Sequence, residues 1–168
     1  MALIHELLYR DEGKVDLANV DFLDYLRHLA DYLADLHHVE SAKLRLAVEG
    51  EDIRLDADLA TDCGLIASEL ISNALRHAFP GGAKGRVSVT LRKDGAGGIL
   101  FEVADDGVGL PAGLAGRDAD LGEGGNRTTG LRLVRLIAGQ LGASLEFLET
   151  EGGGCTARLG LKARSAAG

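Results

Sequence analysis

Apolar residues recur every three or four positions in four stretches of the chain, and this spacing predicts four helices. The predicted helices cover residues 2–9, 20–36, 58–78 and 129–141. The third is the longest, and it ends at the turn-forming sequence Pro80-Gly81-Gly82. Three side chains near its start compete to cap it, namely Asp58, Thr61 and Asp62.

Polar and apolar residues alternate between these helices, which is typical of strands with one buried face. The predicted strands cover residues 43–48, 53–55, 86–92, 99–104, 144–148 and 155–161. The second is a short partner for the first, and Lys93–Gly98 is a hairpin turn that predicts an antiparallel pair. Because helices and mostly antiparallel strands are segregated, this order predicts an α+β sandwich with helices on one face of a mixed sheet.

The longest predicted helix carries a line of polar side chains beside its apolar stripe. Glu69, Asn73 and His77 stand four residues apart, so they lie along one side of the helix. A carboxylate, an amide and an imidazole in a row indicate either a satisfied capping network or a site that faces a polar ligand. The helix alone leaves both interpretations open.

The sequence VADDGVGLP, residues 103–111, places a carboxylate at the end of a strand. Asp105 can accept a hydrogen bond from a buried exocyclic amine such as that of adenine. Gly107 and Gly109 would let a flat ring approach the main chain. The competing interpretation of the same residues is a plain Asp-Gly turn.

The sequence NRTTGLRL, residues 126–133, reads as a loop that runs into the start of a helix. Backbone N–H groups at Thr128, Thr129 and Gly130, together with the positive end of the helix dipole, would bind phosphate there. Threonine that simply caps the helix explains much of the same pattern.

Composition narrows the classes of protein to consider. The 168 residues suit one main domain, and a net charge of −8 argues against a general nucleic-acid binder. The chain has no run of 18 apolar residues and no signal peptide, so it predicts no membrane contact. Cys63 and Cys155 are isolated in the sequence, which predicts buried thiols and suits a reducing cytoplasm.

Taken in order, the three polar stretches resemble the ATP-binding boxes of the GHKL superfamily of gyrases, heat-shock chaperones, histidine kinases and mismatch-repair ATPases. ELISNALRHAF is similar to the N box, DDGVG to the DxGxG box and TTGLRLV to the glycine-leucine box. The variants NALRHAFP and GLRLVRLIAGQLGA most resemble bacterial two-component sensor histidine kinases related to the HWE group, which are HisKA-2-like. The N-terminal ALIHELLYR is similar to the end of the dimerisation and phosphoacceptor region in that group.

The resemblance implies a Bergerat-type fold that binds Mg-ATP and transfers the γ-phosphoryl group to a histidine. Asn73 would coordinate the Mg ion, and Glu69 would polarise a water or complete the outer shell of the metal. Asp105 would hold the adenine amine. The other residues implied around the nucleotide are Arg76, His77, Gly107, Gly109, Leu110, Thr128, Thr129, Gly130 and Leu131. Residues 107–127 would form a lid over it.

The resemblance also implies a division of the chain and a set of partners. Residues 1–38 would be a helical remnant of the dimerisation region with a linker helix, 39–163 the catalytic domain and 164–168 a disordered tail. The histidine acceptor would lie on a dimerisation helix in cis or in trans, with His5 as an alternative acceptor, and a response regulator would act downstream. A cytoplasmic location is implied, with a homodimer only in the full-length protein.

A second function keeps this fold but changes the partner. It is an anti-sigma-type serine kinase, or a non-catalytic phosphotransfer or protein-binding adaptor. The presence of Glu69, Asn73 and Asp105 together in apolar surroundings favours ATP binding, because a scaffold has no need of these polar groups. Thr128 and Arg132 depart from the usual glycines of the third box, which leaves the exact phosphate contacts open.

Overall fold

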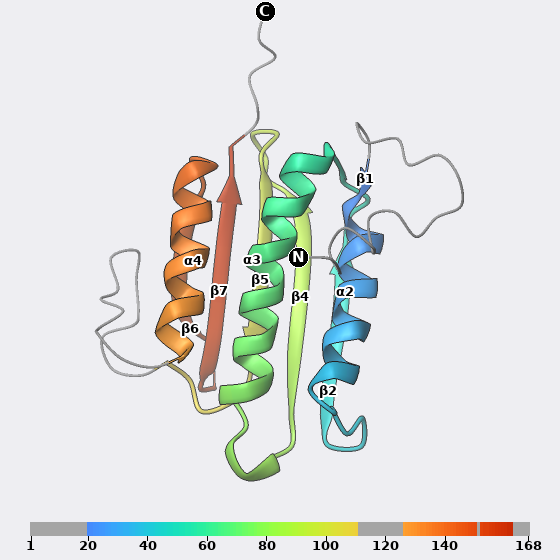
Figure 1. Cartoon of the computed structure of the whole chain (residues 1–168), viewed down its shortest axis with the longest axis vertical. Coiled ribbons are helices and arrows are strands. Elements are labelled where there is room, and N and C mark those ends of the chain that lie inside the picture. Colours follow the sequence, from blue (N-terminus) through green and yellow to red (C-terminus); the bar gives the residue numbers. More distant parts are fainter. Residues whose placement is uncertain (1–19, 111–125, 151, 163–168) are drawn as a thin grey trace, which may run out of the picture.

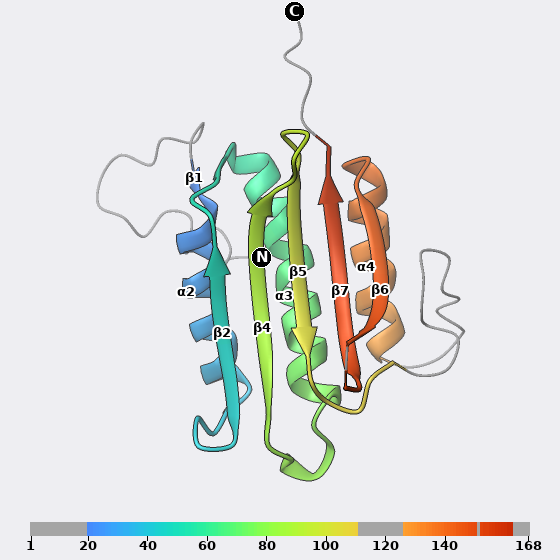
Figure 2. The same cartoon turned by 180° about the vertical axis from the view of Figure 1, so that it is seen from behind.

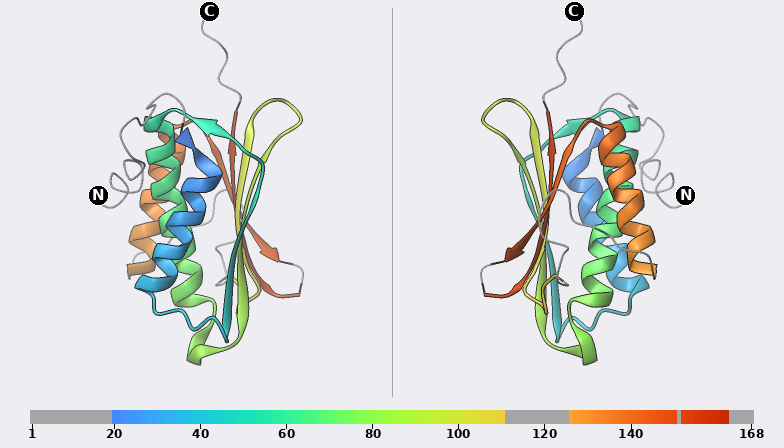
Figure 3. Two further views of the ribbon diagram at one scale, coloured as in Figure 1. Left: turned by 90° about the vertical axis from the view of Figure 1, so that its right-hand side faces the viewer. Right: turned by 90° about the vertical axis from the view of Figure 1, so that its left-hand side faces the viewer.

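The computed structural model has two layers, with helices packed on one face of a five-stranded sheet (Figures 1, 2 and 3). It describes residues 20–110, 126–150 and 152–162, and for residues 126–128 the backbone alone. The side views show the opposite face of the sheet uncovered by any helix among the described residues (Figure 3). This arrangement confirms the α+β sandwich that the sequence predicts.

Three of the four predicted helices lie in the described residues. They are α2 (Phe22–Leu36), α3 (Ala57–His77) and α4 (Asn126–Gln140), with a short 3-10 turn at Pro80–Gly82. The helix predicted over residues 2–9 lies outside the described residues.

The cap of α3 differs from the prediction. The carboxylate of Asp56 accepts a hydrogen bond from the backbone N–H of Leu59 at 2.9 Å, so Asp56 caps the helix. Asp58, Thr61 and Asp62 were the wrong candidates, because the helix already starts at Ala57 and encloses all three.

The large sheet has the strand order β2-β4-β5-β7-β6. Its strands are β2 (Leu44–Gly50), β4 (Gly85–Lys93), β5 (Ile99–Asp105), β6 (Ser144–Thr150) and β7 (Gly154–Leu161). Only the β2–β4 pair is parallel, so the sheet is mixed and mostly antiparallel, as predicted.

The pairing predicted for residues 53–55 is wrong. Strand β3 (Arg54–Leu55) pairs with β1 (Val20–Asp21) in a separate two-stranded sheet, and not with β2. The reason is that the chain just beyond β2 is still hydrogen-bonded to β4, because the N–H of Glu51 donates to the carbonyl of Leu91 at 2.9 Å. The chain then crosses to α2, where the carbonyl of Ile53 accepts from the N–H of Phe22.

One hydrophobic core lies between the helices and the sheet, and α2 belongs to it. Phe22, Leu26 and Leu29 are each at most 1% exposed and share this core with α3 and β4. Burial of these side chains removes apolar surface from water, which is the main force holding α2 in place. The division of the chain at residue 38 stays a prediction.

The end of the fold that matters for function is the lower end in Figure 1. There the C-terminal ends of α3 and β5 meet the N-terminal end of α4 and the turn between β6 and β7 (Figure 2). The stretches that carry the three sequence boxes are therefore brought to one place by the topology.

Replacing Leu26 with Ala is expected to lower the free energy of unfolding by about 2–5 kcal/mol, because it leaves a cavity in the core. The matched control is Leu36→Ala in the same helix, where the side chain is 52% exposed. The control is expected to change stability by no more than about 0.5 kcal/mol. Urea unfolding of both variants measures the difference, and equal losses would show that α2 is not part of the core.

Candidate functional site

A small cavity of about 40 Å³ lies where α3, α4, β5 and β7 meet. Its apolar lining consists of Leu70, Ala74, Ala78, Val103, Leu110, Leu131, Phe147 and Ala157. Asn73, Asp105, Gly109 and Cys155 complete the lining. An apolar cavity with a few polar groups is the usual form of a small-molecule site.

Asp105 faces the cavity because of the alternation of side chains along β5. Phe101, Val103 and Asp105 share the face that the helices cover, and Asp105 is only 8% exposed. Its Oδ1 atom accepts hydrogen bonds from the backbone N–H groups of Gly107 at 3.0 Å and Cys155 at 3.2 Å. These two donors fix the carboxylate at the wall of the cavity.

The neighbouring carboxylate has a different role. Asp106 is exposed and accepts a hydrogen bond from the N–H of Arg86 at 2.6 Å. The Asp-Asp pair of the sequence therefore places one carboxylate in the cavity and the other at the start of β4.

The loop after β5 is joined to the end of α3. The N–H of Val108 donates to the carbonyl of Ala78 at 2.9 Å, and so satisfies a carbonyl that the end of a helix leaves without an internal partner. Gly107 packs directly against Ala78, and a Cβ atom at this position would collide with the carbonyl and the Cβ of Ala78. Glycine at position 107 is thus required for the close approach of loop and helix.

Asn73 points an amide at the cavity from α3. Its Nδ2 atom is buried and has no hydrogen-bond partner among the described residues. Buried polar atoms in folded proteins nearly always have a partner, so this amide is suited to a ligand that the structure does not contain. Rotation of the amide would present its oxygen instead, which is the atom that suits a Mg ion.

Glu69 lies one turn before Asn73 and reaches toward α4. A side chain at Gly130 would collide with its Oε2 atom, so the glycine leaves room for this carboxylate between the two helices. Glu69 is partly exposed there and does not line the cavity itself.

The other residues implied by the resemblance are more scattered. Arg76 is exposed, and neither it nor His77 lines the cavity. Helix α4 already includes residue 126, so the expected loop at 126–128 is helical and Leu131 meets the cavity as a buried apolar side chain. Thr129 is exposed, the side chain of Thr128 lies outside the described residues, and so does most of the predicted lid.

A polar contact between the end of α2 and α3 was not expected from the sequence. The Nε2 atom of His37 lies 3.2 Å from the hydroxyl of buried Ser72, the residue before Asn73. Burial lowers the pKa of His37 below its usual value, and the charges of Arg76 and His38 lower it further. A neutral ring therefore joins the end of α2 to α3 at Ser72.

Sequence reasoning did not assign Cys155 to the site, nor the apolar residues of the cavity lining Leu70, Ala74, Ala78, Val103, Phe147 and Ala157. Cys63 is buried as predicted, but Cys155 is partly exposed and lines the cavity. The signal in the sequence was the position of Cys155 at the start of a strand that follows a glycine turn. Pairing of that strand with β5 brings position 155 next to Asp105.

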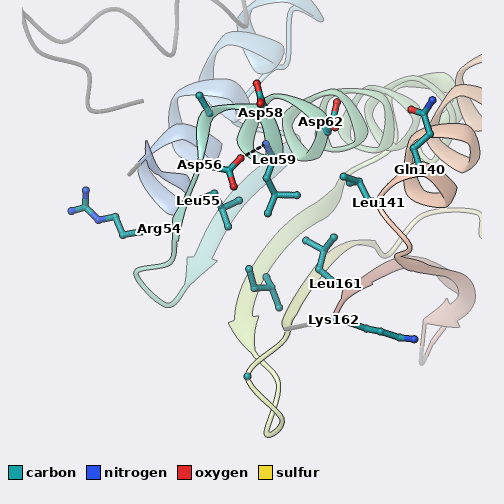
Figure 4. Close-up of a pocket in the computed structure, with 13 residues that line it drawn as sticks. Arg54, Leu55, Asp56, Asp58, Leu59, Asp62, Gln140, Leu141, Leu161 and Lys162 are labelled. Atoms are coloured by element: carbon teal, nitrogen blue, oxygen red, sulfur yellow. Dashed lines mark hydrogen bonds between the residues drawn. The ribbon is translucent and has the colours of Figure 1, made fainter. Parts of the chain in front are cut away.

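A larger cavity of about 880 Å³ lies at the opposite end of the fold, around the start of α3 (Figure 4). The carboxylate of Asp56 is committed to its cap there, and Asp58 and Asp62 stand on the helix beside it. Arg54 and Lys162 extend outward in opposite directions (Figure 4). Three carboxylates line this cavity and repel phosphate, so size alone does not make it a nucleotide site.

Neither a metal cluster nor a membrane span is found in the described ranges 20–110, 126–150 and 152–162. Within them, no three His, Cys, Asp or Glu side chains gather to hold a metal ion. None of their helices combines the length and the apolar character that crossing a membrane requires.

Replacing Gly107 with Ala is expected to lower the free energy of unfolding by about 1–3 kcal/mol, because the added methyl group collides with the backbone of Ala78, the residue that follows α3. The control is Gly95→Ala in the β4–β5 turn, where a Cβ atom meets nothing within 4 Å. This control is expected to stay within about 0.5 kcal/mol of the wild type. Thermal unfolding compares the two, and an unaffected Gly107→Ala variant would contradict the close packing of loop and helix.

Comparison with known proteins gives sequence relatives that cover most of this chain. It is 30% identical over 153 residues to blue-light-activated histidine kinase 2 of Erythrobacter litoralis, which covers 88% of this chain and 41% of the relative. It is 32% identical over 148 residues to the sensor histidine kinase PdtaS of Mycobacterium tuberculosis, covering 86% of this chain and 27% of the relative. The chain therefore spans less than half the length of either relative.

The fold and a family model agree with these relatives. The histidine kinase domain of the Erythrobacter litoralis EL346 blue-light-activated kinase matches with a TM-score of 0.76 and 25% identity, over 95% of this chain and 71% of that structure. The model of the family described as histidine kinase-, DNA gyrase B-, and HSP90-like ATPases matches residues 59–165, more than half of the chain. The chain therefore belongs to this ATPase family and carries the ATPase domain found in two-component sensor histidine kinases.

Proposed function

We propose that this chain binds Mg-ATP in the cavity between α3 and α4 and serves as the catalytic domain of a sensor histidine kinase. The observation that carries the proposal is the meeting of Asp105 and the unpartnered amide of Asn73 in one cavity. Family membership supplies the class of ligand, and the two polar groups fit it.

The base would lie against Asp105. Two backbone N–H groups hold the carboxylate in place, so it is oriented to accept a hydrogen bond from the exocyclic amine of adenine. Gly109 has no side chain and so leaves space for the ring in this part of the wall, while Leu131 and Val103 supply apolar surface. At about 40 Å³ the cavity holds only a few waters, so the walls must part to admit a purine.

The phosphates and the metal would lie toward α3 and the start of α4. The amide oxygen of Asn73 suits a hard cation that keeps several waters, and the Glu69 carboxylate is placed one turn away to orient one of those waters. The N-terminal end of α4 offers the positive end of a helix dipole, which favours phosphate. Bound Mg-ATP would supply the phosphoryl group, and the protein would contribute position and charge neutralisation.

The acceptor would be a histidine on a dimerisation helix, in cis or in trans, with a response regulator downstream in the cytoplasm. Support comes from the two relatives, which are both named as histidine kinases. An anti-sigma-type serine kinase or an adaptor of the same fold is the competing function, and the nature of the phosphorylated residue separates them.

Replacing Asp105 with Asn is expected to weaken Mg-ATP binding by about 10- to 100-fold, the effect of losing a hydrogen bond to a charged group. The matched control is Asp106→Asn, which changes the adjacent exposed carboxylate and is expected to leave affinity within about twofold. Titration calorimetry measures both. A wild-type chain that binds no Mg-ATP, or equal losses from both variants, would contradict the proposal.

Phosphotransfer is tested with γ-labelled ATP and an added dimerisation domain of a relative, which bears an acceptor histidine and lacks an ATPase domain of its own. Acid-labile label is expected on the partner, as phosphohistidine requires, and Asn73→Ala is expected to reduce its rate by about 100-fold or more. The Asp106→Asn chain serves as the control with an unchanged rate. Acid-stable label would indicate the serine kinase instead, and label on His5 of this chain would make that residue the acceptor.

A further inference from the structure

The two thiols of the chain lie in opposite surroundings. Cys63 is 3% exposed in the core, and burial, assisted by the charges of Asp62 and Asp56, raises its pKa to about 12. A thiol in that state does not ionise at neutral pH and is unreactive. Cys155 is partly exposed and belongs to the lining of the cavity described above.

The position of Cys155 is fixed on two sides. Along β7, Cys155, Ala157 and Leu159 share the face that the helices cover, so the sulfur points toward the cavity. The backbone N–H of Cys155 donates to Asp105 at 3.2 Å, which holds its Cα next to the carboxylate. A group attached to the sulfur would therefore occupy space beside Asp105.

The same cavity shows a second sign of a ligand. The amide of Asn73 enters it from the opposite wall, and its buried Nδ2 atom has no partner in the described part of the chain. The thiol thus stands at a place prepared for a bound molecule, whereas Cys63 stands among packed side chains.

We propose that Cys155 is a modification site inside the nucleotide cavity, where a small sulfur electrophile forms a mixed disulfide that excludes the base. The Cys155 thiolate attacks the reagent sulfur, a new S–S bond forms, and the old bond breaks with its electron pair on the leaving group. The Cys155 sulfur is oxidised, the leaving group is reduced, and the thiol proton goes to water. The exclusion step rests on the proposed function.

Exclusion follows from the position of the sulfur. Cys155 lines the cavity next to Asp105, so an adduct on it takes up the space beside the carboxylate that the base would enter when the walls part. Base and adduct then compete for one volume, and competition is reciprocal: the adduct weakens nucleotide binding, and bound nucleotide slows formation of the adduct.

The test treats the whole chain with methyl methanethiosulfonate, with and without Mg-ATP. One methylthio group is expected to be added rapidly, and peptide mass spectrometry is expected to place it on Cys155. Cys63 is expected to react at least about 100-fold more slowly. Mg-ATP is expected to slow the labelling about tenfold or more, and the labelled chain to bind Mg-ATP about tenfold more weakly or worse. Dithiothreitol, which removes the group, is expected to restore binding.

Two variants serve as matched controls. Cys63→Ala is expected to react and to lose binding as the wild type does, whereas Cys155→Ala takes up no rapid label, so treatment leaves its own affinity unchanged. Peptide mapping of the wild type locates the label even where a variant fails to fold.

Different failures have different meanings. Rapid label on Cys63, or a labelled Cys155 that binds Mg-ATP with the untreated affinity, overturns this inference alone. An untreated chain that binds no Mg-ATP overturns the proposed function and, with it, the exclusion of the base.

Discussion

The Asp105 carboxylate is the point at which the walls of the cavity are joined. It ends β5, and its Oδ1 atom accepts one hydrogen bond from the following loop and one from the start of β7. The same loop reaches α3 through the Val108–Ala78 hydrogen bond, which only a glycine at position 107 allows. Sheet, loop and central helix therefore keep one relative position, and the geometry of the candidate site depends on it.

Sequence reasoning succeeded where a pattern extends over many residues. The apolar period of α3 spans more than five turns of helix, so an error at one residue does not change the interpretation. Alternation along β5 also decides between two adjacent carboxylates, since Asp105 shares a face with buried Val103 and Asp106 does not. Both results follow from local geometry that the sequence alone contains.

The errors concern single residues and distant partners. Asp56 rather than Asp58 caps α3. Several side chains near this point are equally good caps, so the sequence alone does not fix the first residue of the helix to within two positions. The pairing of β3 with β1 depends on where α2 packs, which no local pattern encodes. The place of Cys155 in the cavity depends on the register between β7 and β5, again a contact between residues far apart in the chain.

The polar line of α3 shows how one regular spacing places side chains in different surroundings. Steps of four residues advance the direction of a side chain by about 40°, because a helix has 3.6 residues per turn. From Glu69 to His77 the line therefore turns by about 80° around the helix axis. Glu69 consequently lies between α3 and α4 beside Gly130, Asn73 reaches the cavity, and His77 has turned past it. Of the three side chains, Asn73 lines the described cavity, and the places of Glu69 and His77 beside a nucleotide stay predictions.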